Sequence, residues 1–163
     1  DGIRDRSPSR GLGDVYKRQL LASPAYGERW ARHWLDVVRY ADSDGVTQKA
    51  PPRSWSFKYR DYTIRALNAD KPWNEFVIEQ LAGDELVPPP HQDLSAEQAD
   101  RLIATGFLRM APDGTGSGGV DAMVARNEVV ADTIRIVSTS LLGLTVGCAR
   151  CHDHRYDPIS QAD

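Results

Sequence analysis

The residues best suited to do chemistry lie together near the C-terminal end of the chain. Cys148 and Cys151 are separated by two residues, and His152 follows the second cysteine directly. This spacing is typical of c-type haem attachment, in which two thioether bonds hold the porphyrin and an imidazole ligates the iron. The motif therefore predicts haem c as the cofactor, with Cys148 and Cys151 as attachment points and His152 as the axial ligand.

No residue stands out as a sixth iron ligand. Met110 and Met123, the two methionines of the chain, each lie in a pattern in which methionine usually fills a gap in a core. His33 lies within an amphipathic stretch, where we expect a polar flank or an interior hydrogen bond rather than iron ligation. The sequence therefore leaves the sixth position open.

The same cluster could instead hold a metal ion without a porphyrin. It contains four soft or borderline donors, the number that a closed zinc site requires, namely Cys148, Cys151, His152 and His154. Zinc or another divalent metal is therefore the alternative cofactor, and His152, His154 and Asp157 are the candidate metal ligands. Donors so close in sequence usually need help from a distant segment to complete a tetrahedron.

Two further roles concern the neighbours of the motif and its thiols. Asp153 or Asp157 is expected to orient a ligating imidazole through its second ring nitrogen, as carboxylates beside metal-bound histidines commonly do.

Cys148 and Cys151 could alternatively form a disulfide that only cross-links this part of the chain. This structural use stays open beside the haem interpretation.

Five amphipathic patterns predict the helices that must position the cluster. Apolar residues recur at helical spacing in residues 24–41, 59–68, 73–81, 96–107 and 121–142. Loops rich in glycine, proline and polar residues separate these patterns, and no alternation of strands and helices surrounds the motif. The sequence therefore predicts a mainly α fold, an irregular helical domain with long loops.

Local signals predict where several of these helices begin or end. Ser23 is expected to cap the first helix, and Asn68 to end the second in the left-handed conformation. Gly83 is expected to stop the third. Ser95 and Gln98 match a capping box at the start of the fourth, which makes this start the best marked in the chain.

The fifth pattern is predicted to form the central helix of the domain. Its apolar residues share one face and comprise Met123, Val124, Val130, Ile134, Val137 and Leu141. Gly143 and Gly147 follow just before the cysteines, where glycine permits a close backbone approach. Large aromatic residues elsewhere are expected in the core or against the cofactor, namely Trp55, Phe57, Tyr62 and Trp73.

Composition and motifs exclude several classes of function. The 23 acidic residues outnumber the 20 basic ones, so the chain lacks the positive surface of a nucleic-acid binder. No apolar run approaches the roughly 20 residues needed to cross a bilayer, so no membrane span is predicted. The glycine-rich residues 111–119 lack the strand and lysine of a phosphate-binding loop. Asp42 and Asp44 are expected in a solvated turn because no complete calcium-binding loop follows them.

The helical domain is predicted to span residues 20–163. Residues 1–19 resemble translated sequencing-adapter sequence, and their polar composition fits a disordered arm equally well. The chain stops soon after the motif without a closing element, so we expect a fragment truncated at its C-terminus. Other domains of the same longer polypeptide are the partners that this implies.

Three stretches of the chain resemble a known family. Residues 143–159 contain the motif and the Asp-His-Arg-Tyr-Asp-Pro-Ile run that follows it, and residues 26–36 and 74–84 add similar upstream segments. From about residue 20 to residue 163 the chain resembles the planctomycete-type cytochrome c (PSCyt-type) domains of large secreted bacterial proteins. The resemblance implies an extracytoplasmic location, periplasmic, secreted or at the cell surface, together with haem binding.

These observations lead to one main hypothesis and two alternatives. The main hypothesis is c-type haem binding and electron transfer, with an unknown redox partner, in an extracytoplasmic multidomain protein. The first alternative is a metal-dependent module associated with hydrolases that break down polysaccharides. The second is a structural module held by a Cys/His metal site or a disulfide. The sequence identifies no catalytic residue.

Overall fold

The computed structural model describes residues 8–45, 51–116 and 119–163. Across these three ranges the chain forms α-helices and no β-strand, so the predicted mainly α fold is confirmed. The helices are α1 (Pro8–Leu21), α2 (Ala25–Val37), α3 (Ser56–Asn68), α4 (Trp73–Ala82), α5 (Ala96–Ala104) and α6 (Ala122–Val137). Three short helical turns complete them, namely η1 (Thr105–Arg109), η2 (Ser138–Leu142) and η3 (Val146–Arg150).

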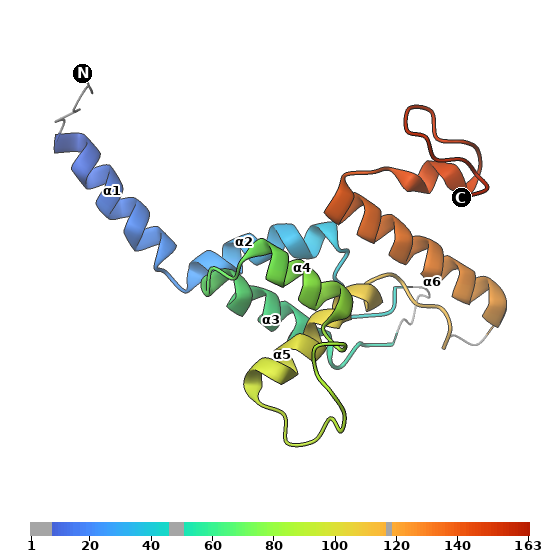
Figure 1. Ribbon diagram of the computed structural model, residues 1–163, viewed down its shortest axis with the longest axis horizontal. Helices are drawn as coiled ribbons and strands as arrows, with labels where there is room; N and C mark the ends of the chain where they lie inside the picture. The colour runs from blue at the N-terminus through green and yellow to red at the C-terminus, as the bar shows by residue number, and fades with distance from the viewer. Residues whose placement is uncertain (1–7, 46–50, 117–118) are drawn as a thin grey trace.

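The helices form a body with one element projecting from each side (Figure 1). α2, α3, α4, α5 and η1 pack on one another. α6 flanks this body and carries the C-terminal turns, whereas α1 points away from it at the opposite end of the molecule (Figure 1). Residues 1–7 of the segment that resembles adapter sequence lie outside the described residues, and α1 contains the rest of that segment.

Trp34 on α2 joins the two parts of the hydrophobic core. Its ring stacks on Phe107 at 5.8 Å between centroids and meets Phe76 edge-on at 5.2 Å. The first part of the core contains Val38, Tyr59, Phe107, Met110, Ala111 and Ile136. The second contains Tyr62, Ala66, Phe76 and Ala104. Because α6 contributes Ile136 to the first part, the helix that precedes the cysteine motif is anchored in the core.

Several polar groups inside this core are paired with one another, although the buried Nε2 of Gln80 has no partner among the described residues. The Tyr59 hydroxyl accepts a hydrogen bond from Trp34 Nε1 (2.9 Å) and donates one to Gln80 Oε1 (2.6 Å). The Tyr62 hydroxyl donates to Glu79 Oε2 (2.7 Å), which also pairs with the Lys71 ammonium (2.5 Å). Burial raises the pKa of Tyr59 far above its ordinary value. These bonds compensate the cost of burying polar groups and restrict how the helices can pack.

The cap of α2 comes from a distant residue rather than from Ser23, so that prediction was wrong. Asn68, the last residue of α3, accepts a hydrogen bond from Gly27 N (2.7 Å) and donates one to Pro24 O (2.9 Å). Asn68 is helical, and the left-handed residue that follows is Asp70, with φ 49°. The side chain of Asn68 therefore ties the end of α3 to the first turn of α2.

The start of α5 and the end of α4 are both well defined. The capping box is confirmed, because Ser95 Oγ accepts from Gln98 N and the Gln98 side chain accepts from Ser95 N. Gly83 follows α4 as predicted, but its φ is −61°, which any residue adopts. A Cβ at position 83 would lie 2.1 Å from Arg101 O. Glycine is needed here because α4 and α5 approach closely.

The helix that precedes the motif is shorter than predicted. α6 ends at Val137 and continues as the π-helical turn η2. The hydroxyls of Ser138 and Ser140 donate to the carbonyls of Ile134 and Ile136, at 2.6 and 2.7 Å. Such side-chain bonds compete with the regular helical ladder, which accounts for the change of pitch.

The apolar face predicted for this helix is largely exposed. Ala125 and Ile136 are the buried residues of α6, while the exposed apolar side chains include Met123, Val124, Val130 and Ile134. Helical spacing identifies which residues share a face but not which face the rest of the chain covers. The helix predicted to be central therefore flanks the body.

Three of the four large aromatic residues predicted for the core or the cofactor lie at the surface. Trp55 and Trp73 are 69% and 59% exposed, and Phe57 is also exposed, whereas Tyr62 is buried as predicted.

In the part of the chain that the structure describes, no helix combines the length and apolar character needed to span a bilayer.

Candidate functional site

The cysteine motif lies on a short turn at the surface of the molecule. Cys148 is part of η3, and Cys151 follows this turn directly. Both cysteines are exposed free thiols, and His152 is exposed as well. The two sulfurs are therefore accessible from solvent and are not joined in a disulfide.

Contacts with α6 hold this turn in place. The guanidinium of Arg150, between the two cysteines, pairs with both carboxylate oxygens of Glu128 on α6, at 2.9 and 2.5 Å. This pairing lowers the pKa of the Glu128 carboxyl. At Gly147 a Cβ would lie 3.1 Å from Arg135 Cδ, so the turn and the helix are closely packed. The position of the motif is thus set by α6.

The imidazole of His152 is fixed with one ring nitrogen free. Its Nδ1 lies 2.8 Å from the carbonyl oxygen of Asp153. Because a carbonyl oxygen can only accept, Nδ1 carries a proton, and in the neutral imidazole Nε2 bears the lone pair. Nε2 has no hydrogen-bond partner among the described residues, so His152 can offer this nitrogen to a metal.

His154 has the opposite tautomer and uses both ring nitrogens within the chain. Its Nδ1 accepts from the backbone N–H groups of Asp157 (2.8 Å) and Tyr156 (3.3 Å). The proton is therefore on Nε2, which donates to Thr145 Oγ1 at 2.9 Å. With 6% of its side chain exposed, His154 closes the segment around the motif instead of offering a ligand.

The predicted donors do not converge on one point. Within residues 8–45, 51–116 and 119–163, no three side chains of His, Cys, Asp or Glu lie close enough to hold a metal ion. Asp157 Oδ2 lies 3.3 Å from His154 Nδ1, which already accepts two N–H groups. The Asp153 carboxylate accepts from Gln161 N (2.8 Å). The main-chain carbonyl of Asp153 contacts the imidazole of His152. The carboxylates of Asp153 and Asp157, one of which was predicted to orient a ligating imidazole, instead contact Gln161 N and His154.

Comparison with known proteins assigns the chain to a family. The family model PSCyt2, described as a protein of unknown function (DUF1549), matches residues 12–163. The chain belongs to this family. The match includes residues 12–19, part of the segment that resembles adapter sequence. No curated protein and no solved structure matches the chain.

The candidate axial ligands of this PSCyt2 domain lie in contrasting environments. Met110 is buried in the core with 5% exposure, and Met123 is 73% exposed in the first turn of α6. His33 is exposed on α2, with its ring tilted against Trp30 at 5.3 Å between centroids. Met110 thus fills the core as expected for methionine, and His33 is a polar flank.

A cavity lies behind the motif rather than around it. It has a volume of about 360 Å³ and is bounded by α6, η3 and the C-terminal residues, including Ala131, Ile134, Val146, Ala149 and Ile159. Cys148, Cys151 and His152 do not line it. The three residues of the motif therefore lie outside this cavity.

Sequence reasoning missed two residues that position the PSCyt2 motif. Thr145 bonds to His154 across nine residues, and Glu128 pairs with Arg150 across 22. Neither residue belongs to the cysteine motif or to a recognisable ligand spacing. Each contact depends on how the chain folds back after α6, and no local pattern in the sequence signals it.

Proposed function

We propose that this domain carries a covalently attached haem c and transfers electrons, with Cys148 and Cys151 as attachment points and His152 as the axial ligand. The observation that carries the proposal is the state of His152. Its Nδ1–H is committed to the Asp153 carbonyl, which leaves Nε2 exposed with its lone pair free. A hydrogen bond donated by the ring nitrogen that does not bind the metal commonly orients a ligating imidazole and raises its basicity.

The two thiols support the same function. Covalent attachment requires free thiols, because each S–H adds across a vinyl double bond, the sulfur bonding to one carbon and the proton going to the other. Cys148 and Cys151 are both free and exposed. The donor set on this turn therefore fits the requirements of haem attachment, with two thiols and one available imidazole nitrogen.

Electron transfer is the activity that this placement favours. A bound haem would supply one-electron redox chemistry at its iron. The chain's own residues hold the turn against α6 through Arg150 and Glu128 and keep the motif at the surface. A surface position permits close approach of a redox partner. The resemblance of residues 143–159 to cytochrome-type domains supports an extracytoplasmic setting for this activity.

The test is production of the 163-residue chain together with c-type haem maturation machinery. We expect a Soret band, a pyridine haemochrome spectrum typical of two thioether bonds, and a mass that includes haem after denaturation. The double variant Cys148→Ala/Cys151→Ala should retain no haem under denaturing conditions. His152→Ala should keep the covalent haem but alter its axial coordination, whereas the matched variant His33→Ala should change neither property.

Other results would overturn the proposal. If an established c-type cytochrome matures in the same cells while this folded chain carries no haem, the haem function is wrong. Stoichiometric zinc that depends on Cys148 and Cys151 would favour the metal-dependent alternative. A Cys148–Cys151 disulfide with neither metal nor haem would favour the structural alternative.

A further inference from the structure

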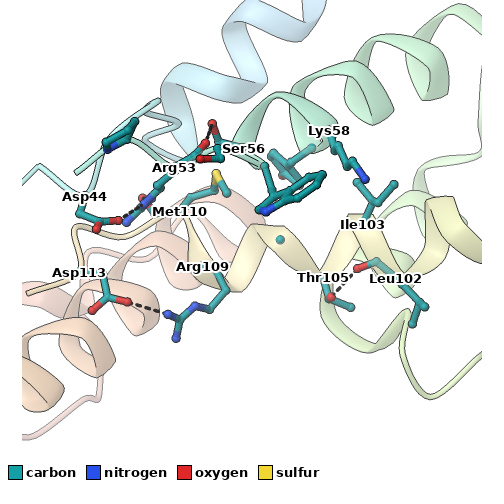
Figure 2. Close-up of a pocket in the computed structure, with 15 residues that line it drawn as sticks. Asp44, Arg53, Ser56, Lys58, Leu102, Ile103, Thr105, Arg109, Met110 and Asp113 are labelled. Atoms are coloured by element: carbon teal, nitrogen blue, oxygen red, sulfur yellow. Dashed lines mark hydrogen bonds and ion pairs between the residues drawn. The ribbon is translucent and has the colours of Figure 1, made fainter. Parts of the chain in front are cut away.

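A second pocket, far from the cysteine motif in sequence, has the dimensions of a small-molecule site. Its volume is about 620 Å³, and it lies between the start of α3 and the segment formed by the end of α5 and η1 (Figure 2). Ligand pockets in proteins typically measure about 300–1,000 Å³ and combine apolar walls with a few polar groups. This pocket has both kinds of lining.

Most of the charges that line the pocket are already paired. Arg53 donates to the Asp44 carboxylate at 2.8 Å and to the Ala111 carbonyl at 2.6 Å. Arg109 pairs with Asp113 at 2.6 Å (Figure 2). Asp113 also accepts two hydrogen bonds from Thr115, which lower the pKa of its carboxyl. Neither carboxylate is therefore free to recognise a cationic ligand.

Lys58 is the exception among these charges. Its ammonium lies 4.4 Å from the centroid of the Trp55 ring, and no carboxylate of the described residues lies within ion-pair distance. Figure 2 shows Lys58 on the same side of the pocket as Ile103, away from the Arg53–Asp44 pair. The lining thus carries one uncompensated positive charge, which favours a ligand with a single negative charge.

The apolar part of the lining includes an aromatic surface. The indole of Trp55 is 69% exposed, and Leu102, Ile103 and Met110 contribute to the walls. An exposed tryptophan beside aliphatic walls gains favourable contacts when a flat apolar group covers it. A flat ring carrying one anionic group could pack on the Trp55 indole and pair with the Lys58 ammonium at the same time.

We infer that this pocket binds a planar aromatic monoanion, such as an aromatic carboxylate, whose ring packs on Trp55 and whose anionic group pairs with Lys58. A sugar would need several free hydrogen-bonding groups, and the carboxylates and guanidinium groups of this lining are engaged with one another. The site is independent of the haem motif, and its occupancy does not require an attached haem.

The inference is tested by titrating the 163-residue chain with 2-naphthoate and with its neutral analogue 2-naphthamide. We expect a dissociation constant of about 0.1–1 mM for the carboxylate, as is typical of a ligand of this size. The amide should bind about tenfold more weakly because it cannot pair with Lys58. The NMR signal of the Trp55 indole N–H, assigned by its loss in Trp55→Leu, should shift during the titration.

Two variants and their matched controls complete the test. Lys58→Gln should abolish the preference for the carboxylate, and Trp55→Leu should weaken binding about tenfold. The controls Lys17→Gln and Trp30→Leu replace an exposed lysine on α1 and an exposed tryptophan on α2, and they should leave binding unchanged. Equal affinity of the wild-type chain for the two ligands, or no binding at about 5 mM, would overturn the inference without depending on either variant.

Discussion

His154 Nε2 donates a hydrogen bond to Thr145 Oγ1 at 2.9 Å, and this bond joins the two sides of the cysteine motif. Thr145 lies just before η3, and His154 lies two residues after His152. The bond closes a segment that contains Cys148 and Cys151. Its closure depends on His154 having its proton on Nε2, because Nδ1 accepts backbone N–H groups.

The two histidines of the motif are expected to respond differently to replacement. His154→Ala should leave the N–H groups of Tyr156 and Asp157 without an acceptor, whereas His152→Ala removes no such contact. We expect the free energy of local opening at these amides to fall by about 1–3 kcal/mol, measured by hydrogen exchange. Thr145→Val should give a smaller change in the same direction, and Thr139→Val serves as its control. Unchanged exchange at both amides in His154→Ala would contradict this role.

Gly83→Ala should destabilise the fold through a clash between helices. The new Cβ would lie 2.1 Å from Arg101 O and 2.5 Å from Glu79 O, so α4 and α5 must separate. We expect a loss of about 3 kcal/mol in the free energy of unfolding, measured by urea denaturation. Gly116→Ala is the matched control, since nothing lies within 4 Å of its Cβ. Equal stability of the two variants would contradict the close approach described above.

Tyr59→Phe should show how much the polar contacts of the Tyr59 hydroxyl contribute to the free energy of unfolding. The substitution removes the acceptor of Trp34 Nε1 and the donor to Gln80 Oε1 while leaving the ring in place. Leaving the buried amide oxygen of Gln80 and the partly buried indole N–H of Trp34 unpaired should cost about 1–3 kcal/mol in the free energy of unfolding. Chemical denaturation checks this value, and Tyr156→Phe, at a residue that is 84% exposed, should change stability by less than about 0.5 kcal/mol.

Asp42 provides a prediction for the effect of pH. Hydrogen bonds from the Tyr40 hydroxyl and then from Ser56 lower the pKa of its carboxyl below the ordinary value of 3.8. The resulting stabilisation is present above that ordinary value and is lost as pH falls through the lower folded-state pKa. Tyr40→Phe should raise the pKa of Asp42, as measured by NMR titration of its carboxyl carbon. It should also reduce the fraction of stability lost between about pH 5 and pH 2, whereas Tyr26→Phe should not.

The sequence predicted the helices more accurately than their packing. Periodicity located α2 to α6, and the capping box at Ser95 was confirmed because its two partners are only three residues apart. The cap of α2 was missed because Asn68 reaches it from 41 residues away. The exposed face of α6 was missed for a related reason. Spacing identifies an apolar face, but burial depends on the rest of the fold.

The cysteine motif was predictable as a unit, whereas its detailed geometry was not. Residue spacing alone is enough to group Cys148, Cys151 and His152 into one candidate site. Nδ1 of His152 faces a carbonyl oxygen and therefore carries a proton. Nδ1 of His154 faces two backbone N–H groups and therefore carries none. These partners are backbone atoms whose positions depend on the local turn, so residue types alone could not distinguish the two imidazoles.

The contrast between the two methionines has a consequence for oxidative damage. Thioethers react with peroxide according to their accessibility, and Met123 is 73% exposed whereas Met110 is 5% exposed. Dilute hydrogen peroxide should therefore convert Met123 to its sulfoxide while the fold stays intact, besides oxidising the exposed thiols of Cys148 and Cys151. Peptide mass mapping should detect sulfoxide at Met123 and not at Met110. Sulfoxide at Met110 should appear only when the protein unfolds, because the polar group would have to enter the core. Methionine oxidation can thus report on the integrity of the fold during storage and handling.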